Sequence, residues 1–93
     1  MSYQDQLRGA LDAAIRETGA NLQHSTADVA AYAATRAAHL AAITSEPGFQ
    51  EAVIAERDAV LLFAGVSAAR SADAVDARIV GLIHGALAVA VAG

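Results

Sequence analysis

Three histidines are the side chains of this sequence that could do acid–base or metal chemistry at neutral pH. His24 stands four residues before Asp28, His39 lies fifteen residues after His24, and His84 lies in an uncharged stretch. A zinc site needs three or four ligands at suitable spacing, and His24 with Asp28 supplies two. We therefore predict no metal site, and we expect His84 to be a packed, hydrogen-bonded histidine in the core or a histidine at a helix–helix contact.

The other motifs that could carry catalysis are incomplete. Residues 65–69, GVSAA, begin like the Gly-x-Ser-x-Gly turn of serine hydrolases but lack its final glycine and the strand before it. The glycines are isolated, so no loop could cradle a phosphate. A di-iron bundle needs Glu-x-x-His pairs, and no glutamate here has a histidine three residues later. These absences predict that the chain is not an enzyme and binds no cofactor.

Tyr32, Arg36 and His39 follow one another at helical spacing. Arg36 could stack over the Tyr32 ring as a cation–π pair, because residues four apart are neighbours on a helix. We expect instead that these side chains form an ordinary solvated helix face.

The composition excludes several classes of protein. The chain has 93 residues, a net charge of −4, no cysteine and 56% hydrophobic residues, half of them alanine. A chain of this length forms one domain. Without cysteine there is no disulfide framework, and an acidic chain with six dispersed arginines does not have the basic surface of a nucleic-acid binder. The polar N-terminus does not resemble a secretory signal, so we expect a cytoplasmic location or a place within a macromolecular assembly.

The spacing of apolar residues predicts an all-α fold, and caps and breakers set the helix limits. Gly19 is expected to stop the first helix, Ser25 and Ser71 to cap the second and fourth, and Pro47 to begin the third. The predicted helices span residues 4–18, 26–44, 47–70 and 72–93.

The two parts of the sequence differ in their charge pattern. Residues 1–58 carry four arginines and eight carboxylates on amphipathic helices, whereas the segments 59–69 and 79–93 carry no charge. A helix that is apolar all round must be covered on every side. We therefore predict a small bundle of about four helices in which residues 59–93 form an apolar helical hairpin.

Small residues lie four apart on both predicted arms of this hairpin. Gly81 and Gly85 form a Gly-x-x-x-Gly spacing, and Gly65 with Ala69 forms a similar one. Such spacing lets two helices approach closely. We favour closure of the hairpin through these faces, while a contact between chains or within a membrane is the alternative.

These features predict a non-enzymatic assembly subunit, such as an accessory component of a viral particle. Its partner would be a second copy of itself or a larger protein assembly. The alternative is a membrane-associated hairpin of the pore-forming or anchoring type, built from residues 59–93. However, the uncharged runs of 11 and 15 residues are shorter than the ~20 that a membrane span needs. The predicted interface consists of Leu61, Leu62, Phe63, Gly81, Gly85 and Leu87.

Overall fold

A computed structural model describes residues 2–19, 21–66 and 74–92 of the chain. These residues contain four helices and no strand, which confirms the predicted all-α bundle. Ser71, the predicted cap of the fourth helix, lies outside the described residues. The helices are α1 (Tyr3–Thr18), α2 (Thr26–Ala41), α3 (Phe49–Ala64) and α4 (Ala74–Ala92).

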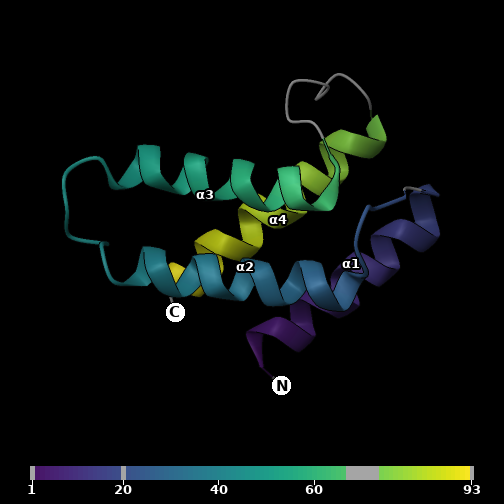
Figure 1. The fold of residues 1–93 in the computed structure, drawn as a ribbon, viewed down its shortest axis with the longest axis horizontal. Helices are drawn as coiled ribbons and strands as arrows, with labels where there is room; N and C mark the ends of the chain where they lie inside the picture. The colour runs from purple at the N-terminus through teal and green to yellow at the C-terminus, as the bar shows by residue number, and fades with distance from the viewer. Residues whose placement is uncertain (1, 20, 67–73, 93) are drawn as a thin grey trace.

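The helices α2 and α4 form the centre of the arrangement, because each of them packs against the other three. In Figure 1, α3 runs back alongside α2 in the opposite direction, and α4 crosses both obliquely. Helix α1 packs against α2 and α4. The molecule is flat, with principal extents of 38 × 31 × 18 Å. A body this thin leaves a large share of each helix close to the surface.

Local sequence signals fix three of the helix ends, two of them as expected. The Ser25 hydroxyl accepts a hydrogen bond from the Asp28 backbone N–H at 3.1 Å, which confirms the predicted cap of α2. Ser2 caps α1 in the same way, through the N–H of Asp5. Gly19 ends α1, and its N–H donates to the carbonyl of Ile15.

The prediction that the third helix continues to residue 70 is wrong, because α3 ends at Ala64. Gly65 follows it in the left-handed conformation, at φ 80°. The N–H of Gly65 then donates to the carbonyl of Leu62, and the N–H of Val66 donates to that of Leu61. These paired bonds are a Schellman ending. A Cβ at residue 65 would also come within 2.5 Å of Gln23 Cγ, so the position requires glycine for two reasons.

Two other limits also differ from the expectation. Helix α2 ends at Ala41 rather than at residue 44, because Ile43 N–H bonds back three residues to Leu40 and tightens the chain into a turn. Helix α3 begins at Phe49 rather than at Pro47, because Gly48 between them takes a left-handed φ of 82°.

The core is assembled from one face of each helix. On α2 its members are mainly alanines, and on α4 they are large aliphatic residues. Because alanine is small, α1 and α4 can lie close to α2, and close packing of this kind is what stabilises a small apolar core. No described polar or charged residue is fully buried. The largest fully buried side chains are Leu11, Leu40, Leu61, Ile79, Ile83, Leu87, Val29 and Val60.

Candidate interaction surface

The first group of side chains that could act together links α2, α3 and the segment before α2. The Phe63 ring lies between two other rings, with centroids 4.0 Å from His24 and 4.7 Å from Tyr32. Both pairs are stacked, and such pairs stabilise a contact beyond the area that they bury. These three residues form one group with Arg36, His39 and Glu56. We call this group the α2–α3 cluster.

The charged members of the α2–α3 cluster continue the stack. Arg36 donates a hydrogen bond to the Tyr32 hydroxyl at 2.7 Å, and its guanidinium lies 5.0 Å from the centre of that ring. The hydrogen bond to Tyr32, and after it the charge of the Glu56 carboxylate, raises the pKa of Arg36 above its usual range. The expectation of an ordinary solvated face is therefore wrong for Tyr32 and Arg36. Sequence spacing indicated this pair but could not indicate its partner on α3.

Glu56 is the residue of the α2–α3 cluster that the sequence analysis did not identify. Its side chain is 12% exposed, and its carboxylate oxygens lie 3.3 Å from Arg36 Nη1 and 3.4 Å from His39 Nδ1. The oxygen facing Arg36, Oε2, is buried and accepts no hydrogen bond from the described residues. The ion pair with Arg36 offsets the solvation that this oxygen loses. The carboxylate therefore bridges two residues of α2 and ties α3 to that helix.

The histidines form no metal-binding group within the described part of the chain. No group of three or more His, Asp or Glu side chains there could hold a metal ion. His24 stacks on Phe63, and His39 lies beside Glu56. His84 is half-buried, but its buried Nδ1 has no hydrogen-bond partner among the described residues, so the expected hydrogen bond is not found there.

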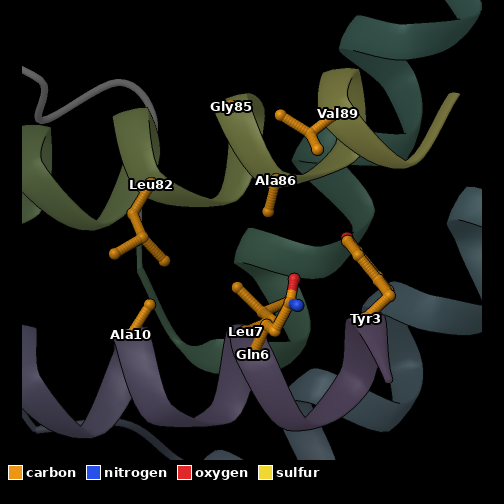
Figure 2. Close-up of a pocket in the computed structure, with 8 residues that line it drawn as sticks. All are labelled: Tyr3, Gln6, Leu7, Ala10, Leu82, Gly85, Ala86 and Val89. Carbon is orange, nitrogen blue, oxygen red and sulfur yellow. The ribbon is translucent and has the colours of Figure 1, made fainter. Parts of the chain in front are cut away.

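A groove between α1 and α4 is the second candidate, and it differs in chemistry. It has a volume of about 190 Å³. Figure 2 shows side chains of both helices pointing into it, with Leu82 facing Ala10 at one end and Val89 near Tyr3 at the other. No charged residue lines this groove, which we call the α1–α4 groove. Its lining residues are Tyr3, Gln6, Leu7, Ala10, Leu82, Gly85, Ala86 and Val89.

Tyr3 brings a polar atom to the α1–α4 groove. Its hydroxyl oxygen is buried and has no hydrogen-bond partner among the described residues. Burial raises the pKa of Tyr3 above its ordinary value of 10.0, because the ionised form would lose its solvation. An unsatisfied buried hydroxyl destabilises a fold by about 1–3 kcal/mol. The lining of the groove thus includes a residue whose hydroxyl the described residues leave unpaired.

The outer face of α4, defined here by Gly81, Gly85, Ala88 and Val89, adjoins the α1–α4 groove through Gly85 and Val89. All four residues are exposed, and Val89 is 68% exposed. A Cβ at Gly81 or Gly85 would meet no atom of the described residues within 4 Å. The hypothesis that these glycines close a hairpin within the chain is therefore not confirmed, and Ala69, on the other predicted arm, lies outside the described residues. Each glycine destabilises a helix by about 1 kcal/mol relative to alanine, and no contact with the described residues offsets this.

The six residues predicted as an interface lie in different environments. Leu61 and Leu87 are fully buried and contact the core of the chain itself. Phe63 belongs to the α2–α3 cluster, and Leu62 projects from α3 with 79% of its surface exposed. Gly81 and Gly85 lie on the outer face of α4. Thus the structure brings the two glycines together on an exposed face but places Leu61 and Leu87 together in the core, and Val89 beside the glycines was not predicted.

None of the described helices combines the length and the apolar character that crossing a bilayer requires. Comparison of the chain with known protein families, with curated proteins and with solved structures finds no match.

Proposed function

We propose that this chain is a non-enzymatic assembly subunit that associates with other protein through the outer face of α4 and the adjoining α1–α4 groove. The observation that carries the proposal is the exposure of an uncharged helix face. Val89 is 68% exposed beside Gly81 and Gly85, and the sequence has no charge from Ile79 to Gly93.

The pattern of exposure distinguishes this surface from ordinary scattered apolar residues. Leu62 and Ile54 are also exposed on α3, at 79% and 47%, but charged residues accompany them, including the exposed Asp58. Isolated apolar residues of that kind are normal on a protein surface. On α4 the exposed residues are contiguous along the helix and continue into an apolar recess. A contiguous patch of this type is typical of a protein–protein contact.

The α2–α3 cluster supports the same proposal by contrast. Its charges and rings are paired within the chain, and in the described residues no metal ligands or catalytic partners gather around Glu56. Nucleophilic or acid–base catalysis would require a base within hydrogen-bond reach of a reacting group, in a site that can hold a substrate. The cluster is thus better explained as a set of contacts that holds α3 against α2 than as an active site.

The experiment that tests the proposal is a measurement of mass in solution by light scattering. The wild-type chain should exceed its monomer mass of 9.4 kDa at high micromolar concentration. Val89→Asp should return it towards the monomer, because a carboxylate placed on this surface would lose its solvation in the contact. Leu62→Asp is the matched control, since it puts the same charge on a more exposed leucine of another helix.

Circular dichroism of both variants must show unchanged helix content for the comparison to be valid. A wild-type chain that stays monomeric at several hundred micromolar would contradict the proposal. It would also be contradicted if Leu62→Asp dissociated the oligomer and Val89→Asp did not.

A further inference from the structure

The outer face of α4 has a shape that could fit a copy of itself. Val89 projects at one end, and Gly81 leaves a flat, open position at the other, two helical turns away. The α1–α4 groove lies beside them, with Leu82 and Ala10 near its far end. A contact between identical chains across a two-fold axis requires such a projection and recess on one surface.

The charge of the molecule also favours a second copy as the occupant. The chain carries a net charge of −4, so most pairings of two copies bring carboxylates together. The lining of the α1–α4 groove and the outer face of α4 carry no charge. Arg78, at the beginning of that face, forms an ion pair with Glu17 of α1 within the same chain. Two copies can therefore meet here without like charges, and a strongly charged partner finds no complementary group.

We propose that α4 pairs with α4 of a second copy, antiparallel, across a two-fold axis at Gly85. In this pairing each Val89 lies over Gly81 of the second copy, because the two residues stand four positions on either side of Gly85. The Val89 side chain then enters the recess beside Leu82. A parallel pairing would instead place Val89 against Val89. This inference rests on the proposed function and names the partner at that surface.

The absence of cysteine from the chain allows a direct test by disulfide formation. A disulfide requires Cα atoms within about 7 Å, so single cysteines report which positions meet. Under mild oxidation Gly85→Cys should form a covalent dimer. An equimolar mixture of Val89→Cys and Gly81→Cys should form the mixed dimer. Val89→Cys alone should not, and Leu62→Cys on α3 is the control for random collision.

A second pair of variants tests the glycine without new chemistry. Gly9 on α1 resembles Gly85, since it is exposed and a Cβ there would also meet nothing within 4 Å. Both Gly9→Ala and Gly85→Ala should raise the melting temperature of the monomer by roughly 4 °C, measured in dilute solution. Gly85→Leu should weaken dimer formation at least about tenfold, whereas Gly9→Leu should leave the dissociation constant unchanged.

The outcomes separate this inference from the proposed function. Association without a disulfide at residue 85, equal cross-linking by the Leu62 control, or a mass that grows without limit as concentration rises would each overturn the two-fold pairing. All three leave the assembly function standing. Cross-linking of Val89→Cys to itself would replace the antiparallel arrangement by the parallel one and overturn the proposal as stated. Absence of any association would overturn both proposals.

Discussion

The α2–α3 cluster and the outer face of α4 are both surface regions, yet they use their side chains in opposite ways. In the cluster, rings stack at 4.0 and 4.7 Å, and Glu56 lies between Arg36 and His39. On α4 the exposed residues are small or aliphatic, and a Cβ at Gly81 or Gly85 would meet no described atom within 4 Å. The first region pairs its rings and charges within the chain, whereas the second leaves apolar surface exposed. A partner chain could therefore bury apolar surface at the second region.

The difference also shows how the same type of spacing can have two outcomes. Tyr32 and Arg36 are four residues apart, as are Gly81 and Gly85. The first pair is completed by Glu56 from α3, because α2 and α3 lie side by side. The second lies on an exposed face, where a Cβ at either glycine would meet no described atom within 4 Å. Which spacing becomes an internal contact depends on the direction in which the helix is turned.

The largest effect on stability is expected when a charge is placed on the buried side of α4 instead of its outer face. Leu87 is fully buried, so Leu87→Asp should lower the free energy of unfolding by more than about 4 kcal/mol and unfold the chain at room temperature. Val89→Asp, two residues later on the exposed side, should change the monomer by less than about 1 kcal/mol. Denaturant titration of both variants in dilute solution is the measurement. Similar losses in the two variants would show that α4 is oriented differently.

An intermediate effect is expected in the α2–α3 cluster. Glu56→Gln keeps the shape but removes the charge that Arg36 and His39 face, and should destabilise the fold by about 1 kcal/mol. The difference between wild type and variant should shrink in 1 M salt, because part of the interaction is screened. Thermal melts at low and high salt check this. If the melts of the two proteins coincide at low salt, the ion pairs do not fasten α3 to α2.

A smaller effect is expected at Tyr3, in the α1–α4 groove. Because burial raises its pKa, the unfolded chain ionises Tyr3 near pH 10 while the folded chain keeps it protonated. The stability due to the neutral hydroxyl is therefore complete below pH 10 and is lost as the pH rises towards the folded-state pKa. Tyr3→Phe should abolish this decline and raise stability at neutral pH by about 1 kcal/mol, the lower end of the cost of an unpaired hydroxyl, because Tyr3 is only partly buried. Unfolding titrations at pH 7 to 11 test both points, with Tyr32→Phe as the control.

No effect of salt on the mass of the oligomer is expected. Association through the uncharged surface of α4 should give the same mass at 0.05 and 1 M salt, to be measured by light scattering, since a contact without charges is not screened. Dissociation in high salt would show that charged residues elsewhere form the contact and would remove the distinction between the two regions.

The sequence predicted the helices well where the signal was local. The Ser25 cap and the Gly19 stop followed from residue type and spacing alone. It failed at Gly65, where an apolar run suggested a continuous helix. There a left-handed residue and two backbone hydrogen bonds ended it, in a place where only glycine clears Gln23. The limits of α3 therefore depended on a segment 42 residues away.

By itself the sequence determined an all-α chain, without disulfides, whose second half carries little charge. These properties depend on composition and on periods of a few residues, which are present before the chain folds. Only the tertiary structure decided which apolar residues remain outside. Leu61 and Leu62 are adjacent in sequence, yet one is fully buried and the other is 79% exposed, because α4 and α2 cover one side of α3. Likewise, the sequence of α4 has no polar stripe that could have predicted which of its faces lies outside. Its packing against three helices left Gly81, Gly85 and Val89 as the face that no neighbour covers.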